Sequence, residues 1–372
     1  MRLSILPARF TAVAAALAAG AVLALPAGAT PLTTYSSVGI NSNLSVLDGT
    51  DNDKATSTDG SALELDVSGS QNFAYGNGSG GYTVKPTTNE TFARSSLQSG
   101  ELKTRASLGF GTDVSGIDIP VGTGNGASSA MSVFGDSFRA YSGDTPFLWT
   151  DGTTAQFSFG ITGTTTVPDN LAVPNGYGAG EPKNQVYTSL VLKVFQPGGL
   201  DIWNQLANFD FNAYSDFATG YAIFQALSAQ LTGMTIANEY WYFGDLVVPY
   251  PVDAAHVLPV SADTPTEVTA QFTPDGDFDW LLTLDSTVFL DSSLENVTAT
   301  MDFSSTVTTS YQGPDGAVTY SASGLFPGTL ALSTAPAQVP EPGSAVLFGV
   351  GVIGLVATRR RRVRGGAKAT DH

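Results

Sequence analysis

Two strand-like runs joined by a turn decide the fold class: Glu267-Val268-Thr269-Ala270-Gln271-Phe272, then Thr273-Pro274-Asp275-Gly276, then Phe278-Asp279-Trp280-Leu281-Leu282-Thr283-Leu284. The first run alternates between polar and apolar residues, which is the period of a half-buried strand. In the joining segment, proline presets φ, aspartate bonds to the nearby backbone and glycine accepts a positive φ. The pattern predicts a strand, a turn and a second strand.

The same turn recurs further along the chain. Gly313-Pro314-Asp315-Gly316 separates the segment Val297–Thr309 from the segment Ala317–Ser323. Both turns lie between strand-like runs, so we predict two β-hairpins and antiparallel pairing in the last third of the chain.

Other segments also have strand-like patterns. Ala155–Ile161 alternates in the same way, Leu63–Val67 forms a short alternating run, and Val186–Phe195 is apolar on both faces, as a central strand requires. Between Leu200 and Leu231 aromatic and leucine residues recur at near-helical steps; we expect one short helix between Asp201 and Asn208 and leave Tyr221–Phe224 open between helix and strand. The predicted fold class is all-β, an antiparallel β-sandwich or jelly-roll-like body.

Composition narrows the possible functions. The 372 residues contain no cysteine, which excludes disulfides, thiolate nucleophiles and cysteine-based metal sites. Between residues 30 and 340 there are eight basic and 31 acidic residues, a formal charge of −23. Nucleic acid is therefore excluded as a partner, and neutral sugars, divalent cations or basic surfaces remain. We expect no cofactor and no metal site.

The N-terminus has the features of a cleaved signal peptide. Arg2 and Arg9 are basic, Thr11–Leu25 is apolar, and Ala27 and Ala29 provide the small residues of a cleavage site. We predict a signal peptide over residues 1–29 and an exported body over residues 30–334.

The C-terminus has three parts in a fixed order. Residues 335–342 form a linker that ends in Val339, Pro340, Glu341 and Pro342; residues 343–358 are apolar; and residues 359–372 begin with Arg359, Arg360, Arg361 and Arg362. We predict a single transmembrane helix over residues 343–358, about 24 Å long at 1.5 Å per residue. The arginines would stop transfer and keep residues 359–372 in the cytoplasm.

This order resembles the PEP-CTERM sorting signal of Gram-negative bacteria. The resemblance implies processing by an exosortase, a membrane-embedded cysteine transpeptidase, and an inner-membrane-tethered intermediate before the protein reaches the cell surface, the outer envelope or the medium. It also implies a structural or binding role without catalysis, associated with exopolysaccharide and biofilm. Exosortase is then the processing partner, exopolysaccharide a candidate ligand, and the membrane a partner through the C-terminal helix until processing.

A serine esterase is the alternative. Val133-Phe134-Gly135-Asp136-Ser137 resembles the first block of GDSL hydrolases, and Asp253-Ala254-Ala255-His256 resembles their last block. By that resemblance Ser137 would be the nucleophile, His256 its base, and Asp253 the residue that orients the imidazole. No Gly-x-Asn-Asp block follows Ser137, and the segment Ser132–Phe138 alternates like a strand, whereas the family places a helix there. The non-catalytic interpretation is therefore preferred.

Three further patterns have a functional and a structural interpretation. Trp203, Trp241 and Tyr242 could form a sugar-stacking platform of a carbohydrate-binding module, although such aromatic residues more often belong to a core. The acidic segment Asp48–Asp53 lacks the spacing of a calcium loop, and we read it as a turn. Asp275, Asp277 and Asp279 could suggest glycosidase carboxylates; we read them as turn residues and a solvated strand face.

Overall fold

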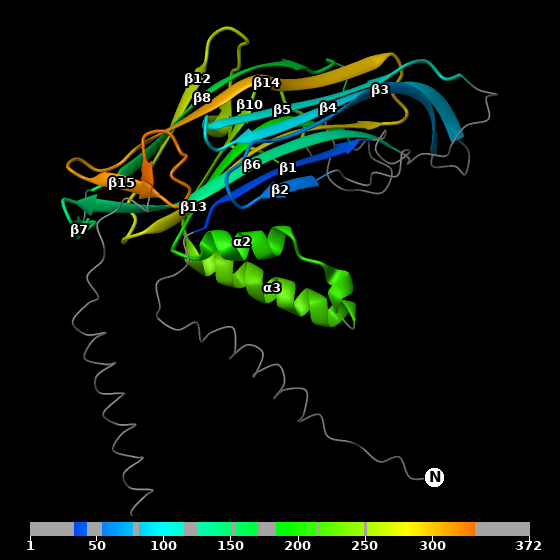
Figure 1. The fold of residues 1–372 in the computed structure, drawn as a ribbon. Helices are drawn as coiled ribbons and strands as arrows, with labels where there is room; N and C mark the ends of the chain where they lie inside the picture. Colours follow the sequence, from blue (N-terminus) through cyan, green and yellow to red (C-terminus); the bar gives the residue numbers. More distant parts are fainter. Residues whose placement is uncertain are drawn as a thin grey trace, which may run out of the picture.

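The computed structural model describes residues 33–42, 54–76, 82–114, 125–150, 153–169, 171, 184–214, 216–248 and 251–331. They form two β-sheets, with a helical pair beneath one of them (Figure 1). The prediction of an all-β body is confirmed. The sheets have ten and six strands, more than the eight strands of a jelly roll.

The ten-stranded sheet has a main path of seven strands in which β13 and β6 lie near the centre. Three short strands are attached to this path through β6 and β15. The order is β11 (Val257–Leu258), β10 (Thr235–Phe243), β9 (Gln185–Phe195), β13 (Phe278–Asp291), β6 (Asn125–Ser142), β1 (Tyr35–Ser42) and β2 (Lys54–Ser57), with β7 (Thr145–Pro146), β15 (Val318–Ser321) and β16 (Leu330–Ala331) attached. The pairs β10–β11 and β15–β16 are parallel, and the other pairs of this sheet are antiparallel.

The six-stranded sheet is antiparallel throughout. Its order is β12 (Thr266–Phe272), β8 (Ala155–Thr166), β14 (Val297–Gln312), β5 (Glu101–Phe110), β4 (Tyr82–Ser96) and β3 (Leu63–Gly76). The predicted strands in Ala155–Ile161 and Leu63–Val67 therefore exist, and so does the predicted central strand, because β9 lies between β10 and β13.

The core lies between the two sheets and is rich in aromatic side chains. Trp280 on β13 is fully buried, and its ring centroid is 4.8 Å from that of Phe157 on β8 in the opposite sheet. Phe134, Phe138 and Phe326 complete the edge-to-face contacts around Trp280. Burying so many rings supplies most of the hydrophobic stabilisation of a sandwich.

The predicted pairing at the two Pro-Asp-Gly turns is wrong. β12 pairs with β8 in the six-stranded sheet, whereas β13 pairs with β6 and β9 in the ten-stranded sheet. Likewise β14 belongs to the smaller sheet and β15 to the larger one. Each turn segment joins one sheet to the other.

The length of the two connections and the burial of the flanking strands explain why each turn segment joins one sheet to the other. Five residues separate β12 from β13, and five separate β14 from β15. Five extended residues reach about 17 Å, which exceeds the roughly 10 Å between packed sheets. β12 is buried on one face only and suits a sheet edge, whereas the first part of β13 is buried on both faces and requires strands on each side.

A helical pair covers part of the outer face of the ten-stranded sheet (Figure 1). Helix α2 (Gly199–Ala207) confirms the short helix predicted between Asp201 and Asn208, and α3 (Phe217–Met234) shows that Tyr221–Phe224 is helical. A short 3₁₀ turn, η1 (Phe211–Ala213), joins them. The residues that attach the pair to the sheet are apolar and buried: Tyr35, Val133, Phe195, Leu200, Ile202, Leu231 and Leu281.

None of the helices formed by the described residues is both long and apolar enough to cross a bilayer. The predicted transmembrane segment at residues 343–358 lies outside the described residues.

Candidate functional site

Ser137 lies in the middle of the fold on β6 and is fully buried. Its Oγ accepts a hydrogen bond from the backbone N–H of Thr33 at 2.9 Å and donates one to the carbonyl oxygen of Thr33 at 3.1 Å. The hydroxyl therefore holds the chain that enters β1, and its burial leaves no access for a substrate.

The two residues before Ser137 also have structural roles. The Asp136 carboxylate accepts hydrogen bonds from the Thr34 hydroxyl, from the N–H of Ser137, and from both the N–H and the hydroxyl of Ser323. Burial raises the pKa of Asp136 to about 6. At Gly135 a Cβ would come within 2.4 Å of the Trp280 carbonyl oxygen, so the position requires glycine. The Gly-Asp-Ser triplet is thus accounted for by packing.

Asp253 and His256 lie together at the far side of the same sheet. Asp253 caps the 3₁₀ turn η2 (Ala254–His256) by accepting the N–H of Ala255, and His256 is the last residue of that turn. The His256 Nδ1 is 3.3 Å from Asp253 Oδ2, and the imidazole stacks on the ring of Tyr240 at 4.5 Å between centroids.

The strand register separates this pair from Ser137. Val257, next to His256, pairs with Tyr242, and the same row continues through β9 and β13 to Met131 on β6. Four strand spacings amount to about 19 Å, and Ser137 lies six residues beyond Met131, about 20 Å along the strand. The Ser137–Asp253–His256 triad is therefore not assembled, and that form of the esterase alternative is wrong.

The aromatic platform is not assembled either. Trp241 is 8% exposed and belongs to the main core, whereas Tyr242, its neighbour on β10, points to the opposite face and contacts Tyr187. Trp203 lies on α2, where the Lys193 ammonium sits 5.0 Å from the centroid of its ring. Because Trp241 faces the core between the sheets while Tyr242 faces the other side of β10, the three rings do not form one platform.

The three aspartates near the first turn separate by role. Asp275 is exposed, Asp277 pairs with Arg139 through a 2.7 Å hydrogen bond, and Asp279 is fully buried. Asp279 Oδ2 accepts the N–H groups of Gly198 and Leu200 at the start of α2, at 2.9 and 3.0 Å. Burial raises its pKa to about 6. The turn interpretation holds for the first two, but the solvated face predicted for Asp279 is wrong because α2 covers it.

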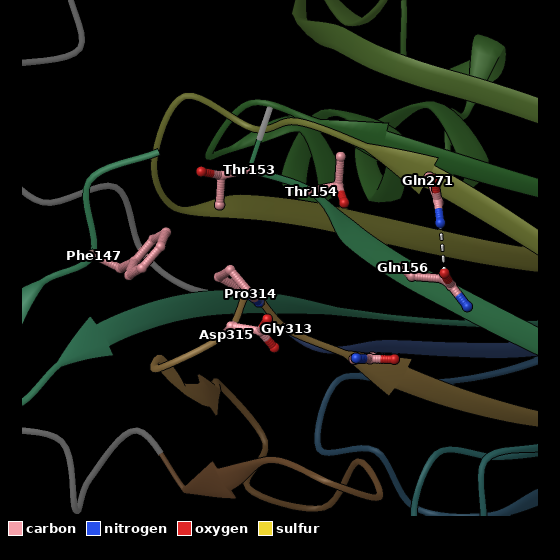
Figure 2. Close-up of a pocket in the computed structure, with 9 residues that line it drawn as sticks. Phe147, Thr153, Thr154, Gln156, Gln271, Gly313, Pro314 and Asp315 are labelled. Atoms are coloured by element: carbon pink, nitrogen blue, oxygen red, sulfur yellow. Dashed lines mark hydrogen bonds between the residues drawn. The ribbon is translucent and has the colours of Figure 1, made fainter. Parts of the chain in front are cut away.

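A cleft of about 420 Å³ opens near the second Pro-Asp-Gly segment (Figure 2). Its lining comes from β8, β12 and β14 and from the segments around β7 and before β15. The lining residues are Phe147, Thr153, Thr154, Gln156, Gln271, Gln312, Gly313, Pro314 and Asp315. Among these described residues one is acidic and none is basic.

Three glutamines form a row across the floor of this cleft. Gln156 on β8 pairs in register with Gln271 on β12 on one side and with Gln312 on β14 on the other. Their chain neighbours Phe157, Phe272 and Tyr311 pack into the core, so the glutamines lie on the outer face of the sheet. Gln271 Nε2 donates to Gln156 Oε1 at 2.7 Å, as Figure 2 shows, and Gln156 Nε2 donates to the Ser158 hydroxyl at 3.1 Å.

An aromatic ring and a proline face the row. Phe147 lies at one end of the cleft and the Gln156–Gln271 pair at the other (Figure 2). The Phe147 ring is held by an edge contact with Trp149 at 5.3 Å, and Trp149 in turn contacts Phe278. Pro314 is buried, and Asp315 beside it is exposed.

The predicted sorting and processing residues lie outside the described residues. These are Ala27 and Ala29, the segment Val339–Pro342, and Arg359–Arg362; the acidic segment Asp48–Asp53 is also outside. Among the described residues no group of three or more potential metal ligands is present.

Comparison with protein families gives one match, which decides the assignment of the C-terminus. Residues 338–362 match the PEP-CTERM protein-sorting motif. The chain carries a PEP-CTERM sorting motif. The motif implies export, processing by an exosortase, and a surface or extracellular location after processing. Searches of curated proteins and of solved structures found no match.

Sequence reasoning did not find the cleft. Gln156, Gln271 and Gln312 are far apart in the chain, and each occurs singly in an alternating strand. Each of the three glutamines is next in the chain to an aromatic residue that faces the core. This shared pattern indicates a row of glutamines only when the register of the three strands is known.

Proposed function

We propose that this protein is a non-catalytic component of the cell surface or extracellular matrix, associated with exopolysaccharide in a biofilm. The observation that carries the proposal is the match of residues 338–362 to the PEP-CTERM protein-sorting motif. The signal-peptide features of residues 1–29 support it, because the body must cross the inner membrane before an exosortase can act on the C-terminal segment.

In this proposal the apolar segment 343–358 holds the exported body at the inner membrane until processing. Arg359–Arg362 stay on the cytoplasmic side, as the positive-inside rule requires. Processing near Pro340-Glu341-Pro342 then frees the body for the outer envelope or the medium.

The properties of the body are consistent with this setting. Its formal charge of −23 keeps it soluble and makes it unsuited to polyanionic partners. Its sequence is rich in Ser and Thr, whose hydroxyls hydrogen-bond to hydrated polysaccharide without ion pairing. The separation of Ser137 from His256 supports the non-catalytic part of the proposal.

The test is the intact mass of the protein recovered from its own cells, in membrane and medium fractions. We expect a species that begins at Thr30 and ends near Pro340 and is found outside the inner membrane. A variant with Pro340, Glu341 and Pro342 all replaced by alanine should accumulate in the membrane fraction with residues 359–362 still attached. The matched control replaces Pro336 by alanine in the same linker and should be processed normally.

Two results would contradict the proposal. One is a wild-type species in the surface fraction that retains Arg359–Arg362, which would make the tail a permanent anchor. The other is normal processing of the triple-alanine variant, which would mean that the motif is not the recognition element.

A further inference from the structure

We propose that the cleft between β8, β12, β14 and the second Pro-Asp-Gly segment is a binding site for a neutral oligosaccharide. This inference deepens the association with exopolysaccharide proposed above and rests on it for the source of the ligand, whereas the cleft itself lies within the folded body and is separate from the sorting motif.

The glutamine row supplies the polar recognition. A carboxamide both donates and accepts hydrogen bonds, which matches the mixed donor and acceptor character of sugar hydroxyls. The Gln156 amide is fixed by its hydrogen bonds to Gln271 and Ser158, and the bond to Gln271 in turn orients the Gln271 amide. No described residue hydrogen-bonds the amide of Gln312, which leaves both of its polar atoms available to a ligand.

The row also sets the size of the ligand. The three glutamines occupy adjacent strands, so their side chains spread over roughly 10 Å at about 4.8 Å per strand. A linear ligand that crosses the strands can contact all three at once. The cleft therefore suits a chain of several sugar units better than a single monosaccharide.

Phe147 supplies the apolar part of the site. A pyranose presents a face of C–H groups that packs on an aromatic ring, and the ring of Phe147 is held in place by Trp149. Pro314, which is buried, also lines the cleft and stiffens its wall. Because these groups are already positioned, binding costs little ordering entropy.

The charge of the lining selects neutral ligands. Among the lining residues that the structure describes, Asp315 is the single charged one, and the body carries a formal charge of −23. A uronate or phosphate group would meet a carboxylate and no cation, so anionic glycans are disfavoured. A wholly apolar ligand would leave the three amides and the threonine hydroxyls without partners.

The experiment uses the full exported protein on an array of neutral gluco-, galacto-, manno- and N-acetylglucosamine oligosaccharides of three to six units, with their uronate counterparts. Any neutral oligosaccharide that binds is then measured by calorimetry with Gln312→Ala and Phe147→Ala. We expect about a five- to tenfold loss of affinity for the first variant, from one lost hydrogen-bonding group, and at least about tenfold for the second. The matched control is Gln71→Ala, an exposed glutamine on β3 at the opposite edge of the same sheet, which should bind as wild type does.

Thermal unfolding of each variant shows whether it is folded, and Gln312→Ala keeps the test valid should Phe147→Ala unfold. Binding of a neutral oligosaccharide that the two cleft variants weaken and the control does not would support the inference. Binding to none of the neutral probes, equal binding of uronates, or affinity unchanged by Gln312→Ala would overturn it. None of these results bears on processing, so failure of this inference is distinct from failure of the proposed function.

Discussion

Replacing Asp136 with asparagine should remove a specific part of the pH dependence of folding. The Asp136 carboxylate is fully buried, and burial raises its pKa from 3.8 to about 6. Asparagine keeps the oxygen that accepts from Thr34, Ser137 and the N–H of Ser323, while the Ser323 hydroxyl can rotate to accept from the new NH₂ group. The substitution therefore removes a buried charge and retains the geometry.

The sign follows from proton linkage. A carboxyl group with a raised pKa binds its proton more tightly in the folded state than in the unfolded state, so its contribution to stability is fully present below 3.8 and is lost as the pH rises through about 6. A difference of roughly two pKa units corresponds to about 3 kcal/mol. We therefore expect the free energy of unfolding of wild type, relative to Asp136→Asn, to fall by about 3 kcal/mol between about pH 3 and about pH 8.

The assay is urea unfolding of the two proteins, followed by tryptophan fluorescence across this pH range. Taking the difference between the two proteins cancels the contributions of other titrating groups, Asp279 and Asp302 among them. The matched control is Asp275→Asn, which makes the same substitution at an exposed aspartate. A difference between wild type and Asp136→Asn that stays constant with pH would refute the reasoning, since the carboxylate would then not be the buried group that takes up the proton.

Three further substitutions test the packing, the helix attachment and a surface ion pair. Gly135→Ala places a Cβ about 2.4 Å from the carbonyl oxygen of Trp280 and should cost about 1–3 kcal/mol, measured by urea unfolding; an unchanged midpoint would contradict the close approach. Asp279→Ala removes the acceptor of two backbone N–H groups at the start of α2 and should cost roughly 2–4 kcal/mol, with faster amide exchange confined to the helical pair as the distinguishing readout. Arg105→Gln breaks the pair with Asp302 on a half-exposed face, so chemical denaturation should show a loss of only about 0.5–1 kcal/mol that shrinks with added salt.

The strands and the first helix could be predicted from the sequence because their signals are local. The alternation in Ala155–Ile161, the two-sided burial of Val186–Phe195 and the helix near Trp203 each depend on residues a few positions apart. The partner of each strand could not be predicted in the same way. Pro-Asp-Gly specifies a turn of the backbone, but both five-residue connections are long enough to reach the other sheet. The turn alone therefore does not determine which sheet the following strand joins.

The candidate site could not be predicted for a related reason. The Gly-Asp-Ser motif at Ser137 carried the clearest chemical signal in the sequence, yet its residues are used in packing and in buried hydrogen bonds. The cleft residues carried no signal, because amides and hydroxyls are common in a chain of this composition. Their significance comes from the register that aligns β12, β8 and β14, which is a long-range property.

The hydrogen bonds of Asp136 have a consequence for the kinetics of folding. They join residues that are 102 and 187 positions away in the chain, and neither contact can form until distant strands have docked. Proteins dominated by such contacts fold slowly, because the loop entropy is lost before the contacts form. A newly made chain with this connectivity remains unfolded for longer and stays competent for threading through a translocation channel. The same connectivity delays closure of the sandwich until the whole chain, including Ser323, has crossed the membrane.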